Sequence, residues 1–407
     1  MTSSTWAVLR CKFADDTTAT PPDSTYQRLF TGAGTGSFNM VDFFSTMSGG
    51  NLDLSASQVF GWFTVPINRA QYGGTLAGPG QYGRDALVAL CKQTAANNGV
   101  NLSAFDGTLI TFNGHVDLFG YVGGMTAFCD SYSLSPSPLG QEMGHGYGLD
   151  HARQNGSTQD YQDPWDVMSV SNAYMAPSQE WGTIGPGLNA CCMASQGWLD
   201  YNRVWLPPGS PFNNAVLQLR PLHHPNLPGH LALNLDQYLI EYRPAQLWDA
   251  GFPRSAVFVH RFEDNHSYVM AGTAGNYDLQ PGDSFQTGSE QFTYYPWAKV
   301  EVIGIDDNDL TATLSVTYRP NIIFRPPIFG GGGIIIGGVF HPISSREPEN
   351  QIVSQLANYI NAANITDVGL RNQARQAALE AIGKVVSIKS GQLNPIRSPA
   401  PSRSEED

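Results

Sequence analysis

An eleven-residue stretch that begins at Gln141, Q-E-M-G-H-G-Y-G-L-D-H, carries metal-ligating and acid–base side chains at the spacing of a helix followed by a turn. On a helix, Gln141 and His145 share a face and can point at one ion, while Glu142 reaches a water bound to that ion. Gly148 permits a sharp turn that brings His151 back as a third ligand. The pattern predicts one divalent metal, usually zinc, with an open position for water and with Glu142 as the general base.

The first ligand position is the unusual feature of this stretch, because the side-chain oxygen of Gln141 is neutral and less basic than an imidazole nitrogen. Zinc should therefore bind less tightly than it does to three histidines, and another divalent metal can compete for the site. Three arrangements remain open. Gln141 ligates the ion directly, or it lies behind the ligands and orients the water, or Asp150 beside His151 contributes.

The residues around this stretch support a metal site of a known kind. Ser137 and Pro138 have the residue types of an N-cap and a first helical residue. Further along, Met168 stands in the segment D-P-W-D-V-M-S. With the pattern H-E-x-x-H-x-x-G-x-x-H, which the chain matches at every fixed position but the first, this segment resembles the metzincin metalloproteases. In that clan a methionine turn lies beneath the zinc, so the resemblance implies that Met168 supports the metal from below.

Within the metzincins the chain resembles the gametolysin-type peptidases and is also similar to the immune-inhibitor-A type. The resemblance covers residues 5–318 and rests on segments spread along the chain: C-K-F-A-D-D, G-W-F-T-V, G-P-G-L-N-A, G-W-L, Y-L-I-E-Y-R, W-D-A-G-F-P and L-Q-P-G-D-S-F. Some gametolysin-type peptidases carry Gln where others carry the first His. The resemblance implies a zinc-dependent, extracellular metalloendopeptidase that acts on polypeptides.

The overall composition limits the classes of partner. The 407 residues are 41% apolar, which supports a sizeable core, and 43 glycines with 27 prolines indicate many turns and much β-structure. A net charge of −13 argues against nucleic acid or an anionic membrane as a partner. The N-terminal residues lack the basic and apolar regions of a signal peptide, although the family resemblance implies export. The location and the oligomeric state therefore stay open.

The predicted fold class is α+β, with a metzincin-like catalytic domain at residues 1–205 that holds a mixed twisted sheet, the active-site helix and a C-terminal helix. Apolar periodicity predicts the elements before the active-site helix: strands at 6–13, 58–65 and 109–113, a helix at 83–98, and an edge strand at 125–129. Extended peptides add to sheet edges, so residues 123–128 are predicted to line the substrate cleft. Cys191 and Cys192 are predicted to lie on the helix after Met168, and all five cysteines to be buried free thiols.

The remaining chain divides by composition. Short alternating strands over 206–320 predict a β-rich, sandwich-like subdomain. A Gly/Pro-rich linker at 321–346, a helical hairpin at 347–390 and a disordered tail at 391–407 follow. Apart from one adjacent pair, the histidines of the β-rich segment lack the spacing of metal ligands, and the adjacent pair is predicted to be exposed to solvent rather than to bind metal. These histidines are His223, His224, His230, His260 and His266.

Two other functions compete with peptide hydrolysis. Because Gln141 replaces the first histidine of the motif, the chain is also compatible with a catalytically impaired protein that keeps the cleft to bind an extended peptide. A structural or adhesive role of the C-terminal parts is the third reading. The enzyme hypothesis requires both bound metal and hydrolysis, whereas the peptide-binding hypothesis requires neither.

Overall fold

The computed structural model describes residues 2–208, 211–224, 226–288 and 297–319, together with the backbone of strands β22 (Gly333–Ile336) and β23 (Val339–Pro342). These two strands pair antiparallel inside the segment predicted to be a linker. The predicted helical hairpin at 347–390 and the predicted tail at 391–407 lie outside the described residues.

Contacts along the chain define two compact units. The first unit consists of Met1–Trp205, Asn214–Gln286 and Lys299–Val316, and the second of Leu206–Asn213, Thr287–Ala298 and Thr317–Asp407. In the described part of the second unit, the rings of Phe212 and Tyr318 have their centroids 5.9 Å apart. The first unit contains every residue predicted for the metal site, together with much of the segment predicted to be a β-rich subdomain.

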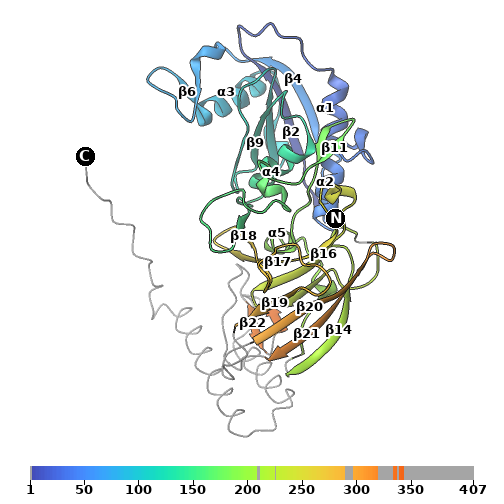
Figure 1. Ribbon diagram of the computed structural model, residues 1–407. Helices are drawn as coiled ribbons and strands as arrows, with labels where there is room; N and C mark the ends of the chain where they lie inside the picture. The colour runs from blue at the N-terminus through green and yellow to red at the C-terminus, as the bar shows by residue number, and fades with distance from the viewer. Residues whose placement is uncertain are drawn as a thin grey trace, which may run out of the picture. The chain divides into compact units, whose positions relative to one another are not determined.

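The first unit is mixed α+β, the class predicted from the sequence (Figure 1). One of its sheets has five strands in the order β4 (Gln58–Thr64), β2 (Trp6–Lys12), β7 (Gly107–Phe112), β9 (Thr126–Asp130) and β8 (Phe119–Tyr121). Neighbours run parallel except β8, which is antiparallel to β9. The nearly continuous burial of β2 and β7 fits parallel strands covered on both faces. The metzincin-like arrangement of subdomains stays a prediction.

Helices lie on both faces of this sheet. Along β2, Leu9 and Cys11 belong to a core cluster with buried residues of α3 (Arg84–Asn97). Side chains alternate along a strand, so Trp6 points to the other face of the sheet. There its indole Nε1 donates to the hydroxyl of Tyr147, the residue that follows α4 (Pro136–Gly146). The other helices of the unit are α1 (Asp23–Phe30), α2 (Met40–Met47) and α5 (Ala190–Ser195).

The edge of this sheet differs from the prediction. The residues predicted as an edge strand form β9, which lies between β7 and β8, and β8 is the edge strand on this side of the sheet. A strand of three residues is too short to show the alternation by which strands are recognised. The backbone of β8 packs directly on α4, since a Cβ at Gly120 would lie 2.2 Å from the carbonyl oxygen of Glu142. The edge strand therefore runs beside the helix that carries the predicted base.

A six-stranded sheet completes the core of the first unit. Its order is β10 (Arg153–Gln154), β18 (His266–Val269), β17 (Ala256–Glu263), β16 (Tyr238–Arg243), β15 (Ala232–Leu235) and β13 (Val204–Trp205). The strands from β15 to β18 are antiparallel. β10 comes from the loop after His151 and joins β18 in parallel. This sheet thus includes part of the loop that carries the predicted third ligand.

The other described strands form smaller sheets. A four-stranded sheet has the order β14 (Phe212–Leu219), β21 (Thr311–Arg319), β20 (Trp297–Asp306) and β19 (Ser284–Thr287). Two-stranded pairs join β1 (Thr2–Ser3) to β3 (Leu52–Asp53), β5 (Tyr72–Gly74) to β6 (Tyr82–Gly83), and β11 (Ala176–Ser178) to β12 (Gly182–Ile184).

All five cysteines are buried free thiols, as predicted. Within the described ranges, no helix has the length and apolar character needed to cross a bilayer.

Candidate metal centre

The helix α4 carries Gln141, Glu142 and His145, and it is buried along its length. It begins two residues earlier than predicted, with Ser135 as the N-cap and Pro136 as the first helical residue. The difference arises because the chain offers a proline at both positions, and either ring fits the first turn, where the missing N–H costs nothing.

Met168 lies against this helix, fully buried in the short helix η4 (Val167–Ser169). A Cβ at Gly144 would lie 2.8 Å from the sulfur of Met168, so a larger residue beside His145 would displace this side chain. The carboxylate of Asp166 accepts a hydrogen bond from the backbone N–H of Met168 at 2.7 Å and fixes the turn. The place of Met168 agrees with a methionine turn, and its supporting role stays a prediction.

The turn after α4 brings His145 and His151 together. Gly148 has φ of +105°, and the two imidazole centroids are 4.7 Å apart with their planes at 84°. The Nδ1 of His145 lies 2.8 Å from the carbonyl oxygen of Leu149. Because a carbonyl oxygen can only accept, Nδ1 carries the proton and Nε2 keeps its lone pair for a metal.

A residue that the sequence analysis missed, Asp160, orients the second histidine. Its Oδ2 lies 3.1 Å from Nδ1 of His151, and its Oδ1 accepts from Nε of Arg153 at 2.7 Å. A carboxylate on one ring nitrogen of a histidine fixes the ring and leaves the other nitrogen free for a metal. Asp160 has no fixed spacing from the motif, so the only signal in the sequence is an acid between His151 and Met168.

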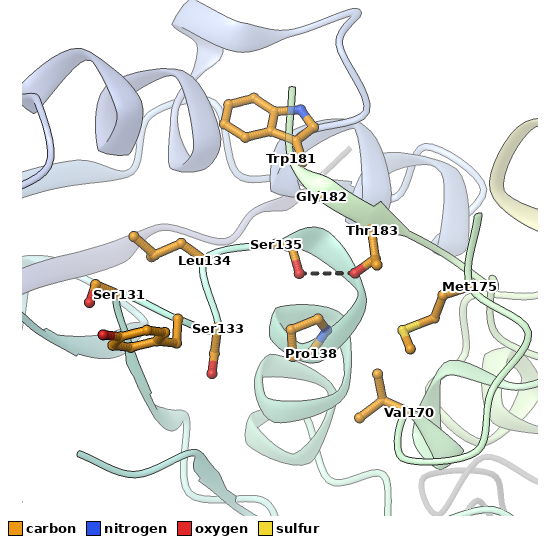
Figure 2. A pocket seen from close by; sticks show the side chains of 11 residues that line it. Ser131, Ser133, Leu134, Ser135, Pro138, Val170, Met175, Trp181, Gly182 and Thr183 are labelled. Carbon is orange, nitrogen blue, oxygen red and sulfur yellow. Dashed lines mark hydrogen bonds between the residues drawn. The ribbon is translucent and has the colours of Figure 1, made fainter. Parts of the chain in front are cut away.

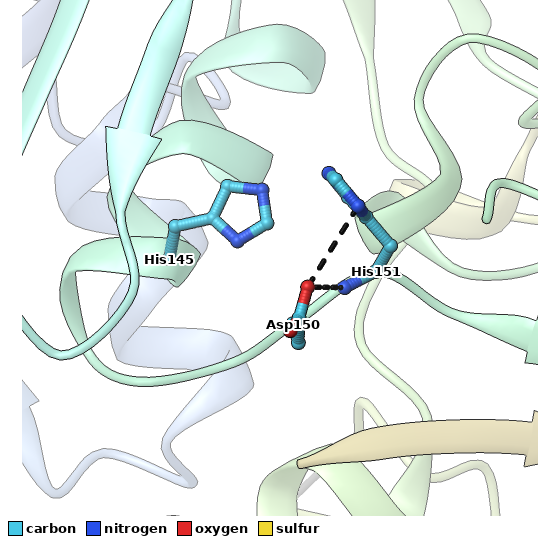
Figure 3. Close-up of side chains that lie close together, drawn as sticks. All are labelled: His145, Asp150 and His151. Atoms are coloured by element: carbon cyan, nitrogen blue, oxygen red, sulfur yellow. Dashed lines mark hydrogen bonds and ion pairs between the residues drawn. The ribbon is translucent and has the colours of Figure 1, made fainter. Parts of the chain in front are cut away.

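Asp150 lies close to both histidines, and the three side chains can offer ligand atoms within 4.8 Å of one another (Figure 3). Its Oδ1 accepts from the backbone N–H of His151 at 2.8 Å and lies 3.7 Å from Nδ1 of the same residue. The carboxylate therefore faces the Nδ1 edge of His151, whereas an ion held by Nε2 would lie at the opposite edge of the ring. This geometry favours Asp150 as an orienting group over Asp150 as a ligand.

Gln141 is buried and connects Glu142 to the residues after Met168. Its Oε1 accepts from the backbone N–H of Val170 at 3.0 Å, and its Nε2 donates to Oε1 of Glu142 at 3.2 Å. An amide oxygen has a second lone pair, which the bond from Val170 leaves available. Direct ligation by Gln141 thus stays a prediction, and the side chain already has an orienting role towards Glu142.

Burial adjusts the protonation of the site in the direction that metal chemistry needs. The pKa of Glu142 rises to about 7 because its carboxyl is buried, an effect that the hydrogen bond from Gln141 partly offsets. The pKa of His145 falls to about 4, again mainly through burial. A metal ligand requires a neutral imidazole, and a general base requires a carboxylate whose pKa lies near the working pH. Two imidazoles that are each hydrogen-bonded through Nδ1, and that each keep Nε2 free, therefore fit a divalent ion such as zinc.

Gln141→His is expected to tighten zinc binding, on the order of tenfold, because imidazole is the stronger zinc ligand and position 141 lies one helical turn before His145. The dissociation constant is measured by competition with a chromogenic chelator, beside Gln141→Ala as the matched control. Unchanged affinity in Gln141→His would show that the side chain at 141 does not face the ion.

A hollow of about 390 Å³ opens at the N-terminal end of α4 (Figure 2). Pro138 of the helix, Val170 after η4 and Trp181 form part of its lining. The hydroxyls of Ser135 and Thr183 meet at 3.0 Å on its wall. Since the N–H of Val170 binds Gln141, this hollow adjoins the candidate site.

Buried charges hold the segment before Met168 to the six-stranded sheet. His260 lies 3.0 Å from Asp163 through Nε2 and 3.6 Å from Glu241 through Nδ1, and all three are buried. Nearby, His223 is buried and lies 3.1 Å from Asp249. The prediction that the adjacent histidine pair is exposed was therefore wrong for His223, because a buried carboxylate compensates the desolvation of its imidazole.

This arrangement makes stability depend on pH through His260. Burial lowers the pKa of His260, but Glu241 and Asp163 outweigh burial and raise it to about 10. An unfolded histidine has a pKa of about 6.5, so the native state holds one more proton between these values. The stabilisation is complete below pH of about 6.5 and is lost as the pH rises through about 10.

Urea unfolding of metal-free protein from pH 6.5 to 9.5 checks this prediction. The wild-type free energy of unfolding is expected to fall by up to about 1.4 kcal/mol per pH unit relative to His260→Gln, which carries no titrating group at this position. Parallel curves for the two proteins would contradict the prediction.

Comparison with known proteins identifies no family. No family model matches the chain, and no curated protein matches it. Among solved structures, catalytically inactive OgpA from Akkermansia muciniphila in complex with an O-glycopeptide substrate is 13% identical over 77% of this chain and 92% of that chain, with a TM-score of 0.30. Wild-type OgpA in two crystal forms is 13% and 14% identical, over 77% of this chain and 91% and 92% of those chains, also with TM-scores of 0.30. A TM-score of 0.30 is too low for a conclusion about fold or activity.

Proposed function

We propose that the chain is a metzincin-like metalloendopeptidase of the gametolysin type, in which His145 and His151 hold a divalent metal, most simply zinc, and Glu142 is the general base. One observation carries the proposal. Both imidazoles are fixed through Nδ1, by Leu149 and Asp160, so that both Nε2 atoms are free, and Glu142 is buried on the same helix three residues before His145.

The chemistry follows from the positions of these groups. A bound divalent ion lowers the pKa of a coordinated water and polarises a carbonyl group. Glu142 takes a proton from the attacking water and later passes it to the leaving amine. The Nε2 of Gln141 donates a hydrogen bond to Oε1 of Glu142 and so limits the rotation of the carboxyl group. Burial of Glu142 keeps bulk water from competing for this proton.

The substrate of this proposal is an extended polypeptide. β8 is one of the two edge strands of the five-stranded sheet, and it packs on α4 at Gly120, next to Glu142. An edge strand offers unpaired backbone groups to which an extended chain can add. The hollow beside Val170 is then placed to take a substrate side chain.

The competing function is peptide binding without hydrolysis. The hydrogen bonds that Gln141 makes with Val170 and Glu142 favour it, because they give the amide that replaces the first histidine partners within the protein without a metal. In this alternative the edge strand and the hollow retain a peptide, and no metal is bound.

Metal analysis and a cleavage assay separate the two functions. The full-length protein is expected to bind one divalent ion and to cleave carboxymethylated casein, and cleavage is expected to stop with EDTA and to return with added zinc, cobalt or manganese. Cleavage that EDTA leaves unchanged would rule out the metal mechanism. Casein binding without metal or cleavage would support the peptide-binding alternative.

A further inference from the structure

The loop after α4 touches a part of the chain to which the sequence gives no role in the site, the hairpin of β17 and β18. β17 ends at Glu263, which pairs directly with His266 at the start of β18. The two residues of the turn, Asp264 and Asn265, have φ of +49° and +66°. Asp and Asn tolerate this left-handed backbone, and two such residues make the tight turn that matches the twist of a hairpin. The sequence therefore fixes the position of the hairpin tip.

The tip contacts Asp150 and His151, the residues at the candidate metal. The carbonyl oxygen of Asn265 accepts from the backbone N–H of Asp150 at 3.3 Å. His266 donates from Nδ1 to the carbonyl oxygen of His151 at 2.8 Å, and its Nε2 lies 3.5 Å from Oδ2 of Asp150. His266 is itself buried, with 9% of its surface exposed. One imidazole thus holds the backbone of the third ligand and lies beside the side chain of the residue before it.

The same sheet also reaches the carboxylate that orients the ring of His151. Arg153 of β10 pairs with Tyr268 of β18, and its Nε donates to Asp160. Fixing the backbone of a loop residue costs conformational entropy. A loop that is ordered before the ion arrives does not lose this free energy from metal binding, so contacts that order it raise the metal affinity.

We propose that His266 is a positioning residue of the metal centre, which fixes the backbone of His151 for metal binding. The six-stranded sheet is then part of the site rather than an appended domain. The inference rests on the proposed metal site, but it does not require that the bound metal hydrolyses peptides.

Cobalt binding to the full-length protein tests this role, because Co²⁺ reports both affinity and ligand geometry through its visible absorption. His266→Ala is expected to weaken Co²⁺ binding by about 10- to 100-fold and to shift the absorption bands. His266→Asn is expected to restore most of the affinity, since the amide nitrogen of Asn can replace Nδ1 as the donor to His151. His230→Ala is the matched control, because His230 is another histidine of the chain and lies between β14 and β15. This variant should bind Co²⁺ like the wild type.

The outcomes separate positioning from plain stabilisation. If His266→Ala lowers the free energy of unfolding of the metal-free protein but leaves the affinity and the absorption of the folded protein unchanged, the role is structural and the proposal is overturned. Rescue by His266→Gln and not by His266→Asn would assign the effect to Asp150 and would also overturn it. If the wild type binds no Co²⁺, the inference and the proposed function fail together. If it binds Co²⁺ and cleaves no polypeptide, only the proposed function fails.

Discussion

Glu142→Gln is expected to lower the cleavage of carboxymethylated casein by about 100- to 10,000-fold, the usual contribution of a general base. The amide has nearly the shape of the carboxyl group, and its oxygen can still accept the hydrogen bond from Nε2 of Gln141. It cannot take a proton from water. Initial rates at saturating zinc, measured together with zinc content, check this result.

The same variant should fold and bind metal, which separates loss of the base from loss of the site. Burial raises the pKa of Glu142, so in the metal-free protein its ionised form opposes folding above the pKa of an unfolded glutamate. A neutral amide removes this opposition. At pH 8 the metal-free variant is therefore expected to be at least as stable as the wild type. Full cleavage by Glu142→Gln would assign the base to another residue and overturn the mechanism.

The parts of the structure that the sequence predicted are those that short-range spacing determines. The strand at 6–13 and the helix at 83–98 agree with β2 and α3 to within a residue, because one is a short and largely apolar run and the other carries Leu87 and Cys91 one turn apart. The active-site helix and the turn at Gly148 follow from one short stretch. Within it, geometry that is local in sequence brings His145 and His151 together.

The parts that were missed depend on contacts between residues far apart in the chain. His266 is 115 residues from His151, and His260 is 97 residues from Asp163, so no periodicity in one sequence connects them. Asp160 is nearer, but its role depends on the path of a loop. The edge strand β8 was missed for another reason, since it has only three residues. The supporting groups of the site are thus less visible in the sequence than the ligands.

His145→Asn is expected to raise the dissociation constant for zinc by more than about 100-fold, the upper end of what the loss of a supporting hydrogen bond costs. The substitution is selective. The side-chain nitrogen of Asn can replace Nδ1 as the donor to the carbonyl oxygen of Leu149, and only the nitrogen that faces the metal is removed. Competition with a chromogenic chelator measures the change, and urea unfolding of the metal-free protein tests whether the bond to Leu149 survives.

Comparison with Gln141→Ala gives this result its full meaning. If His145 and His151 supply most of the binding free energy, His145→Asn should weaken zinc binding far more than Gln141→Ala. In the wild type, the side-chain oxygen of Gln141 already accepts a hydrogen bond from the backbone N–H of Val170. Equal losses would instead make Gln141 a ligand of the same rank as the histidine one turn later. Zinc affinity that His145→Asn leaves unchanged, in a protein that still folds, would place the metal elsewhere and remove the basis of the proposed function.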